Sequence, residues 1–343
     1  MLPKVSVLLP VYNGEQFLEE AIDSILNQTF QDFELLILLE YGSNAASREI
    51  VESKKADQRI RVIENQKGRL GLAESLNLGM RQAKGEYIAR MDADDISLPK
   101  RFAKQVKYLD EHPDIVMCGT AMRGLYDDGH MDDRGYFTDP GSIRFECMLG
   151  NPFGHPTVMW RREVFLRESL FYRNTPYSED FELWKRVVER FPCSNLREHL
   201  LLYRLHGESA SVIYADTLCG VNDALNKEYL AKHYIDYDIV GDFFRGGLTE
   251  EEIEHREDII CQICSIWDNP REAYRALEQR MRLFYIANQN YCFKRYWKRF
   301  GFVYHNAVYD KIRVWMSINF HKMTALIKFH KSNCMGGDLG ERS

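Results

Sequence analysis

The stretch YIARMDADDISLPKR, at residues 87–101, carries the clearest signals of both the architecture and the chemistry. Strand-forming residues come first, and Asp92, Asp94 and Asp95 then follow with no lysine or arginine between them. Carboxylates this close together repel one another unless a cation lies among them. The pattern therefore predicts a buried strand whose carboxyl end holds a divalent cation. From these residues alone, the alternative is a solvated turn in which an aspartate caps the next helix.

The residues around this strand alternate between strand and helix patterns. Short apolar runs rich in β-branched residues predict strands, and apolar residues at helical spacing predict the helices between them. The predicted order is a strand at 4–12, a helix over about 17–26, a strand at 33–40, a helix over about 45–55, a strand at 60–64, a helix at 70–85, the strand at 86–91, a helix from Pro99 and a strand at 114–120. This order predicts an α/β fold with a mostly parallel sheet flanked by helices.

Three of the predicted strands end in unusual residues, at 10–13, 40–43 and 92–95. In open sheets of this kind, ligands bind beyond the carboxyl ends of the strands. We therefore expect the three ends to converge on one crevice. After these strands the pattern is less regular, with strand-like runs at 155–162 and 200–206, a helix at 178–191, and mainly helical sequence from residue 216.

Composition argues against several classes of protein. The formal net charge of −6 gives no reason to expect nucleic-acid binding. No apolar run approaches the roughly 18 to 20 residues that span a bilayer, and the start of the chain does not resemble a signal peptide, so a cytoplasmic location is expected. The eight cysteines are scattered. Cys261 and Cys264 form a lone C-x-x-C, for which reduced thiols are favoured over a metal or redox site.

The segment 291–332 differs from the rest of the chain, because it holds nine lysines and arginines against the single acid Asp310 and is dense in aromatic residues. One interpretation is peripheral contact with the inner face of the cell membrane, with cations over anionic headgroups and rings at the interface. The other is a helical appendage whose aromatic side chains pack on the rest of the protein.

Five blocks of sequence occur in order: VSVLLPVYNGEQFLEEAIDSILNQTFQDFELLIL, GLAESLNLGMRQAKGEYIARMDADDISLPKRF, HPTVMWRR, SEDFELWKRV and LYRLHGESAS. Together they resemble the family 2 glycosyltransferases of bacterial polysaccharide and lipopolysaccharide synthesis, which are inverting enzymes of the GT-A fold. The resemblance covers about residues 3–212. It implies a catalytic domain at 1–215, with nucleotide-sugar binding at 1–120 and the acceptor side at 121–215, followed by a helical C-terminal region at 216–343.

The resemblance implies roles on the donor side. Pro10, Val11 and Tyr12 would line the nucleotide pocket, with the ring of Tyr12 against the base. Asp92 would face the ribose or the metal. Arg69, in a glycine-containing loop with Lys67, could meet the phosphate or base, and surface charge is the equal alternative.

Further roles concern the metal and the reaction. By resemblance, Asp94 would be the principal ligand of Mg²⁺ or Mn²⁺, and His206 would help to hold metal or phosphate. Asp180 would be the general base that activates the acceptor hydroxyl, a task that a carboxylate can perform. The alternatives are a helix-terminal charge for Asp180 and a hydrogen-bonded structural role for His206.

One position departs from the family pattern. The family usually has V-D-D-G-S after the second strand, and its first acidic residue reads the nucleotide base. Here the residues are Leu38-Leu39-Glu40-Tyr41-Gly42-Ser43. Glu40 could still accept a hydrogen bond from the N–H of uracil or thymine, although the base is less certain than the reaction class. On the acceptor side, the candidates for sugar contact are His155, Trp160, Trp184 and Arg204, and helical spacing favours core packing for Trp184.

The resulting expectation is an enzyme that transfers a sugar from a nucleoside-diphosphate sugar, with UDP favoured, to a glycan or lipid-linked hydroxyl. A nucleotidyltransferase that makes a sugar nucleotide is one alternative, but it would ordinarily need a glycine-rich, arginine-bearing loop where residues 11–15 read VYNGE. A sugar- or membrane-binding scaffold without catalysis is the other.

Overall fold

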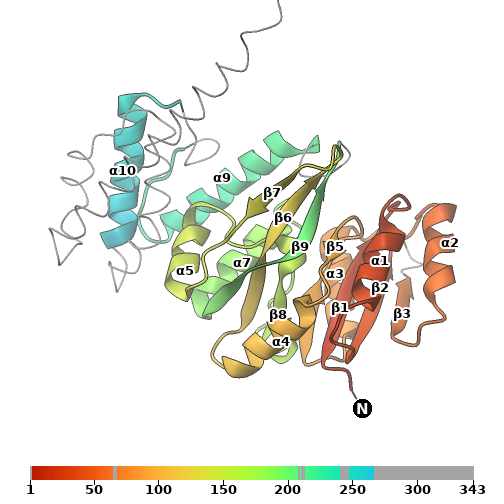
Figure 1. Ribbon diagram of the computed structural model, residues 1–343. Coiled ribbons are helices and arrows are strands. Elements are labelled where there is room, and N and C mark those ends of the chain that lie inside the picture. The colour runs from red at the N-terminus through yellow and green to blue at the C-terminus, as the bar shows by residue number, and fades with distance from the viewer. Residues whose placement is uncertain (1, 65–67, 208, 210–212, 240–246, 266–343) are drawn as a thin grey trace, which may run out of the picture. The chain divides into compact units, whose positions relative to one another are not determined.

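The structure is a computed structural model that describes residues 2–64, 68–207, 209, 213–239 and 247–265 (Figure 1). The chain divides into two compact units, Met1–Gly241 and Asp242–Ser343. In the second unit, the described residues include the helix α10 (Glu250–Ser265). Lys67, the side chain of Cys264 and the basic aromatic segment 291–332 lie outside the described residues, and the domain boundary at residue 215 stays a prediction.

A mixed sheet forms the centre of the first unit (Figure 1). Its strands are β1 (Val5–Val11), β2 (Phe33–Leu39), β3 (Ile60–Glu64), β4 (Tyr87–Arg90), β5 (Ile96–Ser97), β6 (Met117–Tyr126), β7 (Met131–Arg134), β8 (Met159–Arg161) and β9 (Cys193–Leu205). The order is β3-β2-β1-β4-β8-β6-β9-β5, with β7 paired to β6. Strands β3, β2, β1 and β4 are parallel to one another, whereas β8 runs antiparallel between β4 and β6. The predicted α/β sheet flanked by helices is confirmed.

Helices cover both faces of this sheet. They are α1 (Leu18–Leu26), α2 (Ala45–Lys54), α3 (Leu72–Gln82), α4 (Arg101–Glu111), α5 (Pro140–Leu149), α6 (Arg162–Arg167), α7 (Glu179–Arg190) and α9 (Ala215–Ala231). On one face, Val7 of β1 packs in a cluster with Ile22 of α1 and Phe102 of α4. On the other face, Leu8 packs in a cluster with Leu76 of α3 and Trp184 of α7. Successive residues of β1 are therefore buried on opposite faces, as expected for a strand inside a parallel sheet.

Several predicted helix ends are wrong. Ser97 belongs to β5, and α4 begins at Arg101 rather than at Pro99. Helix α3 ends at Gln82, and Gly85 is instead needed for close packing, because a Cβ there would lie 2.5 Å from the backbone nitrogen of Ser6. Helix α1 has Phe17 as its N-cap residue. The side chain of Asn13 accepts a hydrogen bond from the backbone N–H of Asn44 at 2.9 Å.

The run at 155–162 was also predicted as one strand, but it begins as a short 3₁₀ helix, His155–Thr157, and only then becomes β8. Within the part of the chain that the structure describes, no helix is both long and apolar enough to cross a lipid bilayer.

Candidate active site

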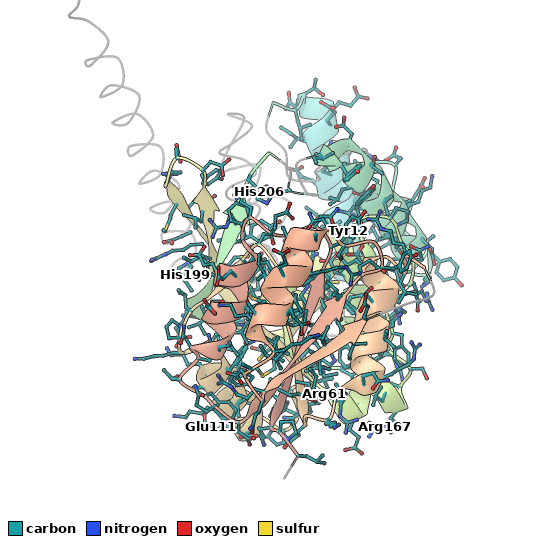
Figure 2. All side chains as sticks on the ribbon, turned by 90° about the vertical axis from the view of Figure 1, so that its right-hand side faces the viewer. Tyr12, Arg61, Glu111, Arg167, His199 and His206 are labelled. Atoms are coloured by element: carbon teal, nitrogen blue, oxygen red, sulfur yellow. The ribbon has the colours of Figure 1, made fainter. Side chains whose placement is uncertain are left out.

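The three unusual strand ends do converge. A cavity of about 410 Å³ is lined by Pro10 and Val11 at the end of β1, by Tyr12 directly after it, and by Glu40 after β2. It is also lined by residues of the loop 91–95 after β4, which we call the aspartate loop. The segment that leads into α3 contributes Arg69, and the end of β9 contributes His206. Figure 2 shows Tyr12 and His206 toward one edge of the molecule, away from Arg61, Glu111 and Arg167. This edge carries the carboxyl ends of the parallel strands, where ligands bind in such sheets.

The aspartate loop brings three carboxylates together. One oxygen from each of Asp92, Asp94 and Asp95 lies within 4.8 Å of the others. Burial is the main cause of the pKa shifts in this loop: it raises the pKa of Asp92 to about 6 and the pKa of Asp95 well above its usual range. The charges of the neighbouring aspartates add to both shifts. Burial and mutual repulsion therefore both disfavour the charged forms of Asp92 and Asp95.

Two arginines hold this loop in place. Arg90 is buried at the end of β4 and forms an ion pair with Asp92. Arg204 donates from its backbone N–H to Asp95 and from Nε to the carbonyl oxygen of Asp94, both at 2.9 Å. The guanidinium group of Arg204 also pairs with Glu20 at 2.6 Å. Arg204, predicted as an acceptor-sugar contact, thus braces the aspartate loop.

The chemistry of this loop fits a hard divalent cation. Asp95 is fully buried, and its Oδ2 has no hydrogen-bond partner among the described residues, which is costly unless a ligand supplies one. Carboxylate oxygens are the ligands that Mg²⁺ and Mn²⁺ prefer. His206 Nε2 lies 3.3 Å from Asp94 Oδ2, so the two residues predicted as metal ligands are adjacent. Their assignment as ligands stays a prediction.

The opposite end of the cavity is aromatic and cationic. The guanidinium carbon of Arg69 lies 3.9 Å from the ring centroid of Tyr12, in cation–π contact. Tyr12 is 42% exposed, so part of its ring is available to a ligand. Pro10 and Val11 also line this cavity, and their place in a nucleotide pocket stays a prediction. Glu40 is buried beneath this region and accepts hydrogen bonds from protein groups.

A second cavity of about 790 Å³ adjoins the first, and the two share Leu72, Asp92 and Asp94 in their linings. Asp180, in the first turn of α7, lines this second cavity. Helix α7 and the aspartate loop are distant in sequence, yet they face one space. This is the arrangement that the predicted roles of Asp94 and Asp180 require.

Hydrogen bonds hold the carboxylate of Asp180. Its Oδ2 accepts from Asn151 Nδ2 at 2.8 Å, and its Oδ1 accepts from the backbone N–H of Phe181 at 2.7 Å. Burial raises the pKa of Asp180, although these hydrogen bonds oppose the shift. Burial and the charge of Asp180 raise the pKa of the adjacent Glu179 to about 7. A carboxylate that is desolvated but oriented is well suited to general-base catalysis.

The two tryptophans predicted as sugar contacts are core residues. Trp160 and Trp184 are both fully buried, with their ring centroids 6.5 Å apart. They line neither cavity, so a stacking role for Trp160 is wrong, whereas core packing of Trp184 is confirmed. His155 does line the second cavity, where its Nε2 lies 3.0 Å from the hydroxyl of Tyr172 and burial lowers its pKa well below its usual range.

Some residues of the site were not assigned a role from sequence. Asn151 is 29 positions from Asp180 and belongs to no motif, so nothing in the sequence connects the two. Arg90 could have been recognised as a charge in the last position of an otherwise apolar strand, where a buried charge usually requires a partner. Glu179 stands beside Asp180 in the sequence, and only its burial distinguishes it from a solvated helix-terminal acid.

Comparison with known proteins gives consistent results. Residues 6–170 match the model of the family described as glycosyl transferase family 2. The chain is 34% identical over 213 residues to the O-antigen biosynthesis glycosyltransferase WbnJ of Escherichia coli, a match that covers 61% of this chain and 82% of that protein. It is 31% identical over 202 residues to the amylovoran biosynthesis glycosyltransferase AmsE of Erwinia amylovora, covering 58% and 75%.

A solved structure shows the same fold. The crystal structure of S. aureus TarS 1–349 in complex with UDP-GlcNAc superposes with a TM-score of 0.55 at 19% sequence identity. The superposition covers 82% of this chain and 86% of that chain.

Proposed function

Because this chain belongs to glycosyl transferase family 2, we propose that it transfers a sugar from a nucleoside-diphosphate sugar to a hydroxyl of a glycan or lipid-linked acceptor, with inversion. The observation that carries this proposal is that two cavities share Asp92 and Asp94 in their linings, one also lined by Tyr12 and the other by Asp180. The relatives named for O-antigen and amylovoran biosynthesis support a role in making a polysaccharide.

The first cavity is the proposed donor site. Tyr12 and Arg69 would bind the nucleotide base, and Asp92 would face the ribose or the metal. UDP-sugars are the donors that we favour, since the structural neighbour TarS was solved with UDP-GlcNAc. Asp94 and His206 would hold Mg²⁺ or Mn²⁺, with Asp95 as a further carboxylate in reach. A metal bound there would offset the charge of the diphosphate.

In the second cavity, Asp180 would accept the proton of the acceptor hydroxyl as its oxygen attacks the anomeric carbon opposite the departing diphosphate. Asn151 keeps one oxygen of this carboxylate oriented through the 2.8 Å hydrogen bond. Desolvation makes the carboxylate a stronger base than a solvated aspartate, because it raises its pKa.

The direct test of this function is a screen of UDP-, GDP- and dTDP-sugars for hydrolysis and transfer, with Mn²⁺, Mg²⁺ or EDTA. We expect at least one donor to release its nucleoside diphosphate in a metal-dependent reaction. Release of pyrophosphate from a nucleoside triphosphate and a sugar phosphate would instead identify a nucleotidyltransferase. Nucleotide binding without turnover on any acceptor would identify a scaffold.

The pH dependence of transfer should report the buried carboxylates. The base must be ionised, so kcat/KM should fall as the pH is lowered, starting from a higher pH than a solvated aspartate would require. Replacing Asn151 by Ala removes a hydrogen bond that lowers the pKa of Asp180 and should move this acid limb to higher pH while transfer continues. The measurement is a kcat/KM profile for both proteins between pH 4 and 9. Superimposable acid limbs would contradict the prediction.

Tyr177 is the proposed acceptor platform, because it lines the second cavity and is 40% exposed. Its ring stacks on Tyr214 with centroids 4.0 Å apart, which gives a rigid aromatic surface suited to a sugar ring. Tyr177→Ala should raise the KM for the acceptor about fivefold or more and leave the donor KM unchanged. Tyr234→Ala is the matched control, because Tyr234 is 98% exposed and lines neither cavity. Equal effects of the two substitutions would rule the platform out.

A further inference from the structure

The carboxylate of Glu40 is enclosed by hydrogen-bond donors of the protein. Its Oε1 accepts from the backbone N–H groups of Tyr41 at 3.0 Å and Leu70 at 2.9 Å. Its Oε2 accepts from the backbone N–H of Gly71 at 2.9 Å and from the hydroxyl of Ser75 at 3.0 Å. We call this set of four hydrogen bonds the Glu40 latch. It joins the end of β2 to the segment that leads into α3.

A carboxylate has about four acceptor positions, two on each oxygen. All four are filled in the Glu40 latch, and the side chain is buried, with only 6% of Glu40 exposed. A ligand N–H could be accepted only after one of these donors had been released and left unpaired, which costs more than the new hydrogen bond returns. Glu40 is therefore poorly placed to read a nucleotide base directly.

The latch determines the position of another residue. Leu70 and Gly71, whose N–H groups it holds, directly follow Arg69, and the guanidinium group of Arg69 lies over the ring of Tyr12. Gly71 has a φ of +78°, a conformation that glycine adopts readily and an L side chain rarely does, so this turn requires glycine at that position. The backbone that carries Arg69 is thus fastened to β2 through one buried carboxylate.

We propose that Glu40 is a positioning residue that sets the donor pocket through Arg69, rather than a group that binds the base. The proposal rests on the function proposed above, because it takes the Tyr12–Arg69 pair to be the surface that recognises the nucleoside diphosphate. It also explains why a longer glutamate follows β2 in place of the family's usual aspartate: its carboxylate reaches across to Leu70, Gly71 and Ser75.

The test is a double-mutant cycle on nucleotide binding. Isothermal titration with UDP and with GDP, in the presence of Mn²⁺, compares the wild type, Glu40→Gln, Arg69→Ala and the double variant. Glu34→Gln is the matched control, because Glu34 is also a buried acid on β2 that accepts hydrogen bonds, from Ser6 and the N–H of Lys84, and it lines neither cavity.

We expect Glu40→Gln and Arg69→Ala each to weaken UDP binding by about fivefold to thirtyfold, and the double variant to bind no more weakly than the weaker single variant. The ratio of UDP to GDP affinity should shift to the same value in all three. Glu34→Gln should bind both nucleotides as the wild type does. The proposal would be overturned if the losses of UDP affinity in the two single variants multiplied in the double variant. It would also be overturned if Glu40→Gln changed the ratio of UDP to GDP affinity when Arg69 was already replaced by Ala.

Ser75→Ala is a milder variant for the case that Glu40→Gln does not fold. It removes one latch donor, and we expect a small loss of UDP affinity that disappears in the Arg69→Ala background. An equal loss in both backgrounds would count against positioning through Arg69.

Amide hydrogen exchange separates this proposal from the proposed function. The Leu70 and Gly71 amides should be protected in the free protein and remain so with UDP bound, whereas a base-reading Glu40 would release them. Exchange in the free protein tests the latch even if the wild type binds no nucleoside diphosphate. In that case the proposed function would fail in the titrations of the wild type.

Discussion

Asp180→Asn should reduce kcat for sugar transfer by about a thousandfold, because general-base catalysis contributes roughly two to four orders of magnitude. An amide has nearly the same shape as the carboxylate but cannot accept the proton of the acceptor hydroxyl. The affinity for the donor should stay the same, since Asp180 lines the second cavity and not the first. The measurements are steady-state transfer rates and titration with the nucleoside diphosphate.

Asp216→Asn is the matched control for this prediction. Asp216 is also an acid in the first turn of a helix, α9, where it lines neither cavity. A charge at that position interacts favourably with the helix dipole, so the control reproduces this contribution to stability without touching the site. If Asp180→Asn retained transfer within a few-fold of Asp216→Asn, Asp180 would be a helix-terminal charge, which is the alternative role considered for it from the sequence.

Asp94→Asn should reduce metal-dependent transfer by about a hundredfold or more, comparable to the loss of one electrostatic contact to the developing charge. Its effect on stability should have the opposite sign. Three carboxylates lie within 4.8 Å of one another, and neutralising one of them relieves repulsion in the protein without metal. The unfolding temperature in EDTA should therefore equal or exceed that of the wild type.

Adding Mn²⁺ should raise the unfolding temperature of the wild type but scarcely change that of Asp94→Asn, because only a ligand that binds the folded state stabilises it. Asp114→Asn, at an exposed position outside both cavities, should respond to Mn²⁺ as the wild type does. Differential scanning fluorimetry with and without the metal gives both readings. Equal metal-induced shifts in Asp94→Asn and Asp114→Asn would mean that Asp94 is not a ligand.

The two predictions concern opposite sides of one junction. Asp94 lies in both cavities and Asp180 only in the second, so the two losses should differ in kind. Loss of Asp94 should lower the affinity for the nucleoside diphosphate in the presence of metal. Loss of Asp180 should slow the chemical step alone. A shared loss of donor affinity in both variants would instead indicate a general collapse of the site.

Much of the first half of the fold could be predicted because its signals are local. The apolar runs of β1 and β2 and the helical spacing in α1 reflect burial on the faces of a parallel sheet, and burial selects residue types position by position. The crowding of Asp92, Asp94 and Asp95 is likewise visible within four positions. Local patterns were therefore enough to place the candidate cation site at a strand end.

Other features depend on contacts between residues far apart in the chain. The antiparallel insertion of β8 between β4 and β6 has no local signal, because a strand-like run does not show which strands it will pair with or in which direction. Trp160 and Trp184 are of a residue type that can stack on a sugar ring. Only the packing of α7 against the sheet shows that both are buried.

The chain's amino acids established most of the order of elements up to about residue 120, the family and the types of group that carry the chemistry, since each is recorded in neighbouring residues. The packed fold was needed to show that Arg204 braces a loop 110 positions away, that Asn151 holds Asp180, and that the carboxylate of Glu40 is already filled by protein donors. Hydrogen bonds of this kind form between surfaces that come together only when helices and sheet pack. No short stretch of sequence specifies which donor will meet which acceptor.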